Sequence, residues 1–296
     1  MVGNLTMGVA GVAASILSNS EALMVDGLFS LVGFFSAMVA IRVGRQSAAG
    51  ADADRPFGYA MDEAVFTTFR SLSLLGLVVF AFTNAVAKIA AYAGGTTPAP
   101  VRFEVIGVYT FVICLICAGL WFNHHRSWKK TGEASDILKL EARAAAFDGA
   151  ITGCAGVGFG IVFLLQGTSL AFIAPVGDSI IVVVLCLVAS GTYWSDFKSS
   201  MGEVLGVSAS QDVVASVHRV VTEVVTKHDV DLVDVAVLKA GRTFSTAVYV
   251  NPKAAISGLQ VDAISTEIRT VLLKQFKQAE VLVIVSESGR ESFKPV

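Results

Sequence analysis

Six apolar segments occupy the first two thirds of this chain and constrain its fold more than any other feature of the sequence. They lie at about residues 2–18, 22–44, 64–93, 103–123, 143–166 and 170–195. Each approaches the length of about 20 apolar residues with which an α-helix crosses a lipid bilayer. Helices are the expected form, because the backbone polar groups of a segment in lipid must be satisfied within it. We therefore predict an α-helical membrane protein with six transmembrane helices.

The overall composition agrees with a bilayer as the solvent. The chain is 54% hydrophobic and 16% charged, whereas soluble domains average roughly 45–50% apolar and about 25% charged residues. The formal net charge is -2, so we expect no nucleic-acid partner. All four cysteines lie in apolar runs, where a free cysteine behaves as a small hydrophobic residue, and we expect no disulfide framework.

The basic residues predict the orientation of the helices. Lys and Arg concentrate in and beside the loops that follow the second and fourth segments, and the loop after the third segment holds few. The basic residues of those two loops are Arg42, Arg45, Arg55, Arg126, Lys129, Lys130 and Lys139. Short loops rich in Lys and Arg stay in the cytoplasm. With an even number of helices, we expect both termini there, in a multi-pass protein of the cell (inner) membrane.

The pattern of apolar and polar residues changes near residue 200. Helical spacing of apolar residues marks 211–227 and 259–276, whereas strand-like patterns mark 231–239, 243–250 and 280–286. This α-β-β-α-β order predicts a small, ferredoxin-like α+β domain with its helices on one face of an open sheet. We therefore divide the chain into a transmembrane domain, 1–200, and a cytoplasmic dimerisation or regulatory domain, 201–296.

Three carboxylates lie inside the apolar segments, namely Asp26, Asp148 and Asp178. A charge near the centre of a bilayer costs at least about 2.5–3.5 kcal/mol, so such residues are functional candidates. Ser30 follows Asp26 at i+4 and shares its helix face. Two carboxylates on facing helices can hold a hard or borderline divalent cation through oxygen. The sequence therefore predicts a metal site that uses Asp26 and Asp148, with Ser30 as a weaker ligand.

Each of these carboxylates has a structural alternative, as a helix cap or a hydrated packing group. That alternative is strongest for Asp178, which follows Gly177 near the end of its segment. We keep Asp178 as a candidate metal ligand beside this alternative. In the tail, His218 and His228 are further side chains of a type that binds metal ions.

Residues 18–63 carry a more specific pattern. The stretch SNSEALMVDGLFSLVGFFS and the loop RPFGYAMDE combine a small-residue turn, an aspartate on the second helix and a Phe/Tyr-Gly loop that ends in Glu. The pattern resembles the second span and following loop of the cation diffusion facilitator (cation efflux) family. Six spans, cytoplasmic termini and an α-β-β-α-β tail resemble it too. The resemblance covers nearly the whole chain and implies a homodimer that exchanges metal ions for protons.

The resemblance also implies a ligand set. The family's transport site takes two side chains at i and i+4 from the second helix and two from the fifth, which here are Asp26, Ser30, Ala144 and Asp148. Zinc-type members have His at the position of Ala144 and often Asp at that of Ser30. The chain thus resembles an atypical member, and we expect its ion not to be zinc by preference. We expect a transported divalent cation (Mn, Fe, Zn or similar) and no resident cofactor. The family's tails can bind a regulatory metal ion, which the resemblance implies for His218 and His228.

The segment boundaries place Asp26 and Asp148 at different depths. The two can meet only if the fifth helix starts early or if the helices tilt. Residues 136–147 contain good helix formers, which favours an early start. Asn84 and Thr152 are nearby polar side chains that can complete the site. Two carboxylates in a low-dielectric site repel, which favours a proton on one of them until a cation displaces it, so we expect proton coupling.

Two other functions fit part of this pattern. A membrane enzyme can use Asp26 and Asp148 as an acid–base pair, as an intramembrane aspartyl protease does. The residues around Asp148 contain no Gly-x-Gly-Asp run, which argues against it. A metal-sensing or scaffolding dimer that has lost transport is favoured by Ala144 and Ser30. We expect a transporter of divalent metal, not an enzyme.

Overall fold

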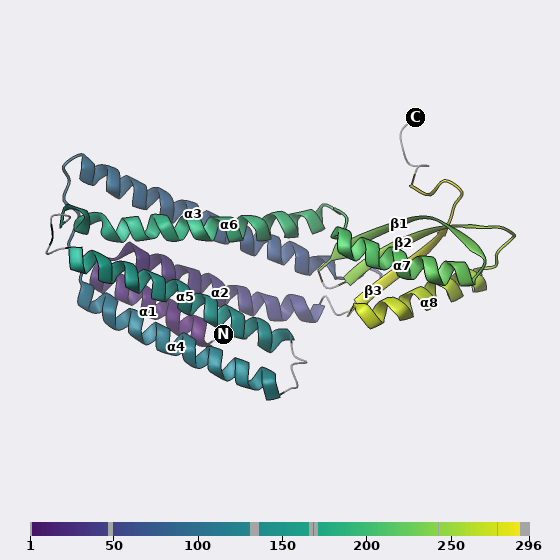
Figure 1. Cartoon of the computed structure of the whole chain (residues 1–296), viewed down its shortest axis with the longest axis horizontal. Helices are drawn as coiled ribbons and strands as arrows, with labels where there is room; N and C mark the ends of the chain where they lie inside the picture. Colours follow the sequence, from purple (N-terminus) through teal and green to yellow (C-terminus); the bar gives the residue numbers. More distant parts are fainter. Residues whose placement is uncertain are drawn as a thin grey trace. The chain divides into compact units, whose positions relative to one another are not determined.

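The computed structural model describes residues 2–46, 50–130, 136–165, 168, 171–241, 243–276 and 278–290. Within these residues, six α-helices precede the tail (Figure 1). They are α1 (Val2–Ser18), α2 (Glu21–Gln46), α3 (Met61–Ala93), α4 (Phe103–Lys130), α5 (Asp136–Leu165) and α6 (Gly177–Val204). A short 3-10 helix, η1 (Ala171–Val176), leads into α6.

Five helical stretches of the described residues are long and apolar enough to cross a membrane. These are Glu21–Gln46, Met61–Ala93, Phe103–Ser127, Asp148–Leu165 and Ala171–Val204. The first helix contributes a shorter apolar stretch, Gly3–Ser18. The mostly helical fold with several membrane spans is thus confirmed, and α1 as a sixth span stays a prediction.

Several helix ends differ from their predicted positions. Helix α4 continues to Lys130 and α5 begins at Asp136, so the early start expected for the fifth helix is confirmed. The sixth apolar segment, predicted at about 170–195, is confirmed as a helical stretch at Ala171–Val204, of which residues 171–176 form a 3-10 turn. Pro175 lies in that turn and cannot donate the backbone hydrogen bond that an α-helix requires. Helix α6 itself begins at Gly177.

Contacts within the chain group it into two compact units, which we describe separately. The first contains Met1–Val39 and Arg70–Ser195, and the second contains Ala40–Phe69 and Asp196–Val296. The second unit therefore joins the tail to the adjoining ends of α2, α3 and α6. The division into domains 1–200 and 201–296 stays a prediction.

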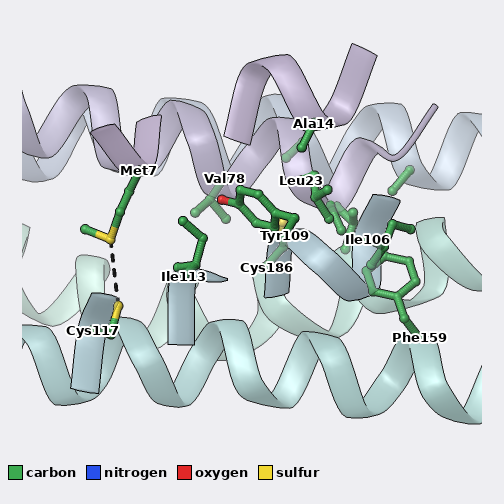
Figure 2. Packing of buried hydrophobic residues seen from close by; sticks show 14 residues of the cluster. Met7, Ala14, Leu23, Val78, Ile106, Tyr109, Ile113, Cys117, Phe159 and Cys186 are labelled. Carbon is green, nitrogen blue, oxygen red and sulfur yellow. Dashed lines mark hydrogen bonds between the residues drawn. The ribbon is translucent and has the colours of Figure 1, made fainter. Parts of the chain in front are cut away.

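In the first unit, α1 and α2 approach until their backbones touch. A Cβ atom added to Gly11 would lie 2.6 Å from the Cα atom of Gly27, and one added to Gly27 would lie 2.7 Å from the backbone nitrogen of Val12. Glycine at both positions makes this approach possible. Around the contact, buried side chains such as Met7 and Ile113 fill the bundle (Figure 2).

The tail forms the predicted α-β-β-α-β order. Its elements are α7 (Gln211–Lys227), β1 (Val230–Ala240), β2 (Thr243–Pro252), α8 (Gly258–Gln275) and β3 (Gln278–Val285). The sheet order is β1-β2-β3, with β1 antiparallel and β3 parallel to β2. A small sheet domain is confirmed, whereas the ferredoxin-like topology stays a prediction.

The strand register explains which face of the sheet is covered. Val235, Val248 and Val283 lie in one row across the three strands and pack with apolar residues of α7 and α8. The next row, Ala236, Ala247 and Leu282, points to the opposite face, because side chains alternate along a strand. Both helices therefore contribute to the apolar core on one face of the sheet.

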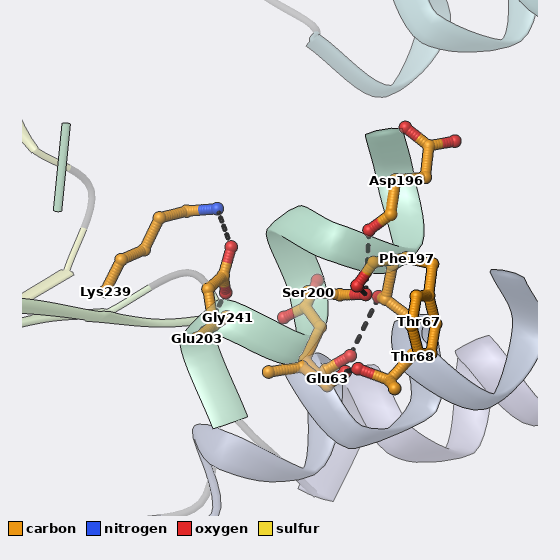
Figure 3. A network of polar contacts seen from close by, with 10 residues as sticks. Glu63, Thr67, Thr68, Asp196, Phe197, Ser200, Glu203, Lys239 and Gly241 are labelled. Carbon is orange, nitrogen blue, oxygen red and sulfur yellow. Dashed lines mark hydrogen bonds and ion pairs between the residues drawn. The ribbon is translucent and has the colours of Figure 1, made fainter. Parts of the chain in front are cut away.

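Within the second unit, the β1–β2 turn contacts the ends of two membrane helices (Figure 3). Lys239 pairs with Glu203 at the end of α6, with 2.6 Å between Nζ and Oε1, and the backbone N–H of Gly241 donates to the other Glu203 oxygen. Gly241 has φ +56°, and a Cβ atom there would lie 2.7 Å from the carbonyl oxygen of Ala60, just before α3. Only glycine fits this turn without strain.

The core of the tail gives a first testable prediction. Ile268 on α8 is fully buried against the sheet, so Ile268→Ala should destabilise the tail by about 2–5 kcal/mol. Amide hydrogen exchange of the full chain in detergent, read by mass spectrometry, should show faster exchange throughout α7, α8 and the strands. Arg269→Ala, at the exposed neighbouring position, is the matched control. Unchanged protection in Ile268→Ala would contradict the packing described here.

Candidate functional site

Asp26 lies just over one turn into α2 and is joined to α4 by a hydrogen bond. The Tyr109 hydroxyl donates to the Asp26 carboxylate, with 2.7 Å between Oη and Oδ2. Gly11 on α1 makes room for this pair, because a Cβ atom there would lie 2.9 Å from the Tyr109 hydroxyl. Asp26 is partly buried, and Tyr109 supplies the polar partner that a carboxylate in an apolar bundle requires.

A small cavity of about 20 Å³ adjoins this carboxylate. Its polar lining consists of Asp26 and Tyr109 together with Thr110 on α4 and Thr152 on α5. All four offer oxygen atoms, which suit hard divalent cations. A cavity of this size holds about one water molecule. It therefore accommodates a single small ion or water, and not an ion with a complete hydration shell.

The packing of α4 against α5 fixes which residues reach this cavity. A Cβ atom on Gly149 would lie 3.0 Å from the Cβ atom of Cys117, and Gly156 packs tightly against Thr110. The two helices are thus antiparallel, and Thr152 lies level with Asp26. Asp148 lies one turn earlier on α5, about 6 Å along the helix axis. Its side chain is exposed and does not line the cavity.

Ser30 lies at the same level as Asp148, where a level is a height along the axes of the packed helices. Its neighbour Leu31 packs on Gly8 of α1, and Met7 contacts Cys117 with 3.7 Å between the sulfur atoms (Figure 2). Asp26 and Asp148 both lie within electrostatic range of that Cys117 thiol. The candidate ligands therefore occupy two levels, one with Asp26 and Thr152 and one with Ser30 and Asp148.

Ala144, Thr152 and Asn84 are the remaining positions predicted for the site. Ala144 is in helix α5, and its side chain lies outside the described residues. Thr152, expected from the sequence as a nearby polar group, lines the cavity, whereas Asn84 does not. Sequence reasoning missed Tyr109. The available signal was a tyrosine inside an apolar segment, because its hydroxyl needs a partner when buried.

Asp178 is almost completely buried at the start of α6 and binds the start of α2. Its Oδ1 atom accepts hydrogen bonds from the Ser20 hydroxyl at 2.7 Å and from the Ala22 N–H at 3.2 Å, and Oδ2 accepts from the Glu21 N–H at 2.7 Å. These bonds satisfy backbone donors that the first turn of a helix leaves free. They account for its burial, and a metal at Asp178 stays a prediction.

The two tail histidines have different partners. His228 lies 2.8 Å from Glu267 on α8, measured between Nε2 and Oε2. This hydrogen bond, together with Lys227, lowers the pKa of the Glu267 carboxyl. His218 contacts Thr222 on its own helix, with 3.4 Å between Nδ1 and Oγ1. A regulatory metal at His218 or His228 stays a prediction.

Across the described residues of both units, no group of three or more His, Cys, Asp or Glu side chains comes together to hold a metal ion. The donor set at Asp26 instead adds neutral hydroxyl groups to one carboxylate. Neutral oxygen ligands bind metals such as Zn²⁺ less well than thiolate or imidazole does. The oxygen atoms at this site therefore suit a cation that prefers oxygen ligands.

A family model described as the cation efflux transmembrane domain matches residues 1–201. The chain belongs to the cation efflux family. A comparison with curated individual proteins finds no match. Members of this family are transporters, not enzymes, and move metal cations out of the cytoplasm. With its apolar helices, the cation efflux protein described here is an integral multi-pass membrane protein, as the resemblance implies.

The Asp178 contact gives a second prediction. Asp178→Ala leaves three donors without their acceptor, and each unsatisfied buried donor costs about 1–3 kcal/mol. We expect a clearly lower midpoint of thermal unfolding in detergent. Ser179→Ala is the matched control, because the Ser179 hydroxyl is buried and has no hydrogen-bond partner among the described residues. Equal midpoints for the two variants would show that Asp178 does not hold α2.

Proposed function

We propose that the protein exports a divalent metal cation from the cytoplasm in exchange for protons, through six membrane-spanning helices, with Asp26 as the central ligand. The oxygen-lined cavity beside Asp26 carries this proposal. It is the part of the bundle where a carboxylate, a phenol and two threonine hydroxyls meet. Membership of the cation efflux family supplies the direction of transport.

The two levels of candidate ligands suggest a path for the ion. An ion that first meets Asp148 and Ser30 has one turn of helix, about 6 Å, to move before it reaches Asp26 and Thr152. Each level offers one carboxylate and one hydroxyl. The two positions thus have the same charge and similar ligands. Neither of them binds the ion so much more tightly than the other that the ion would be retained there.

Proton exchange follows from the low dielectric of the bundle. A carboxylate without a counter-charge there is costly, so either a proton or a cation must neutralise it. A cation that binds Asp26 replaces that proton, and the Tyr109 hydroxyl must turn from donor to oxygen ligand or move aside. Metal and proton then compete for the same carboxylate oxygens.

The expected cation is one that prefers oxygen ligands. Neither level offers a thiolate or an imidazole among the ligands proposed here, so the site lacks the groups that favour Zn²⁺. Carboxylate and hydroxyl oxygens suit Mn²⁺. We propose Mn²⁺ or a similar ion as cargo, with no preference for Zn²⁺.

Transport into proteoliposomes tests this function. Asp26→Asn should lower the initial rate of Mn²⁺ uptake at least about 100-fold, because it removes the one carboxylate among the described residues that line the cavity. Thr152→Val, which keeps the shape but loses the hydroxyl, should lower it about tenfold. Asp148→Asn tests the second level. Glu104→Gln, an exposed carboxylate at the start of α4, is the control and should transport normally.

Two outcomes of that experiment contradict the proposal. Strong selectivity of the unaltered protein for Zn²⁺ over Mn²⁺ would overturn the assignment of the cargo. Normal uptake by Asp26→Asn would overturn the assignment of the ligand. The small number of charged ligands also favours a second candidate function, a metal-sensing or scaffolding protein without transport. Mn²⁺ binding without flux of either ion in the unaltered protein would support that candidate.

We further propose that the tail forms a homodimer through the open face of its sheet. Leu238, Leu282 and Ile284 are exposed large apolar residues, and the strand register places them on the same face. An exposed apolar patch on a soluble domain marks an interaction surface. The helices α7 and α8 cover the other face, which leaves this one for a partner.

The dimer proposal is tested by the mass of the protein in detergent. The double substitution Leu282→Asp and Ile284→Asp should shift the protein from dimer to monomer, because two charges would be buried without partners. A truncation at residue 200 should weaken the dimer as well. Asp262→Asn, an exposed position of α8, which packs on the other face of the sheet, serves as the control. A dimer of unchanged stability after the double substitution would exclude this face.

A further inference from the structure

Among the described residues of the first unit, three sulfur atoms lie around Gly149 of α5. Met7 on α1 and Cys117 on α4 are buried and touch, with 3.7 Å between Sδ and Sγ (Figure 2). Cys114 lies just under one turn earlier on α4, with 4.0 Å between its Sγ atom and the Gly149 carbonyl oxygen. A Cβ atom on Gly149 would lie 3.9 Å from the Cys117 sulfur. None of these residues lines the small cavity described above.

The distance between the Met7 and Cys117 sulfur atoms fits a shared metal ion. Metal–sulfur bonds are about 2.3 Å long, so two sulfur atoms 3.7 Å apart subtend an angle of roughly 107° at such an ion. This is close to the tetrahedral angle. Cys114 is at i-3 from Cys117 and shares its helix face, with about 5–6 Å between the Cβ atoms. It is therefore placed to supply a third sulfur.

The ligand types at these positions select a soft cation. Thiolate and thioether sulfur bind Cu⁺ well, whereas Mn²⁺ prefers oxygen. Charge points to the same ion, because a net charge is costly inside a bundle of membrane helices. One thiolate neutralises one Cu⁺ ion, whereas it would leave a divalent ion with a positive charge.

An ion can approach the sulfur atoms from the level of Asp148. The Asp148 side chain is exposed, and the next residue is Gly149, which has no side chain to separate α5 from Cys117. Asp26 and Asp148 lie within electrostatic range of the Cys117 thiol and attract a cation towards it. The Cys114 thiol is only partly buried, so it can bind the ion first.

We propose that Met7, Cys114 and Cys117 form a binding site for Cu⁺, with Met7 and Cys117 as its principal ligands. Cu⁺ replaces the proton of the Cys117 thiol: the S–H bond breaks, a sulfur–copper bond forms, and the proton leaves to water. No electron is transferred. Met7 binds through a sulfur lone pair, and its unbranched side chain adjusts to the ion.

Bound Cu⁺ joins α1 to α4 beside the path proposed for the cargo. Transport requires the helices around Asp26 and Asp148 to move relative to one another, and a metal bridge between two of them opposes this. Cu⁺ should therefore inhibit transport of Mn²⁺. The binding itself does not depend on the function proposed above, whereas the inhibition rests on it.

The competing explanation is that the sulfur contact is packing alone. A buried cysteine behaves as a small hydrophobic residue, and its S–H group is a weak donor that a thioether can accept. A separation of 3.7 Å also suits that contact. Packing alone predicts that removal of either sulfur changes stability, and that Cu⁺ binding does not depend on these residues.

Cu⁺ binding to the full-length protein in detergent separates the two explanations. The affinity is measured without oxygen, by competition with a coloured Cu⁺ chelator. Loss of an outer-shell partner weakens a metal site about 10–100-fold, and loss of a ligand should do at least as much. We expect Cys117→Ser to weaken Cu⁺ binding at least about 100-fold, and Met7→Leu at least about tenfold. Cys186→Ser, at an equally buried cysteine, is the matched control and should bind Cu⁺ normally.

Two results of this measurement would overturn the site. One is an equal Cu⁺ affinity in the unaltered protein, Cys117→Ser and Met7→Leu, and the other is an equal loss of affinity in Cys186→Ser. Met7→Leu nearly conserves volume and should keep the fold, which its thermal midpoint checks. A copper–thiolate charge-transfer band that is present in the unaltered protein and absent in Cys117→Ser would identify the thiolate directly.

Mn²⁺ uptake into proteoliposomes tests the inhibition. Saturating Cu⁺ should lower the initial rate severalfold in the unaltered protein, whereas Cys117→Ser should keep its own rate when Cu⁺ is added. Equal inhibition of both proteins would overturn the placement of the site beside the path. Absence of Mn²⁺ uptake in the unaltered protein would instead overturn the transport function, and the Cu⁺ affinities would still decide whether the site exists.

Discussion

The carboxylate of Asp178 holds the turn of α2 from which Asp26 is positioned. It reaches from α6 to the first turn of α2 and accepts hydrogen bonds from Ser20, Glu21 and Ala22. Just over one turn later, the same helix places Asp26 in the small cavity. A charge that is costly in lipid is thus stabilised by serving as the cap of another helix.

Close helix packing sets the chemistry at Asp26. Glycine at Gly11 and Gly27 brings α1 against α2 and leaves room for the Tyr109 hydroxyl. Glycines of α5 bring it against α4 in a register that puts Thr152, rather than Asp148, beside the cavity. A register of this kind is decided in steps of one helical turn, about 5.4 Å. A shift by one step would put the carboxylate of Asp148 beside the cavity in place of the hydroxyl of Thr152.

Hydropathy and spacing predicted the parts of the structure that depend on local sequence. The apolar segments became helices, and the alternating segments of the tail became strands in the predicted order. The early start of α5 followed from its helix formers. The sequence could not predict that Tyr109 binds Asp26 or that Asp178 caps α2. Those pairings join residues 83 and 157 positions apart, and packing of whole helices decides them.

The small size of the cavity beside Asp26 has a consequence for the cargo proposed above. An ion bound in this cavity of about 20 Å³ would first have to lose its water, and oxygen atoms of Asp26, Tyr109, Thr110 and Thr152 would have to replace that hydration. Mg²⁺ gives up its water reluctantly and demands a near-ideal octahedron. One carboxylate and three hydroxyl groups offset only part of the free energy that dehydration of Mg²⁺ costs. On the proposal that Asp26 binds the cargo, the cavity would disfavour Mg²⁺ through its dehydration cost, before ligand preference distinguishes among transition metals.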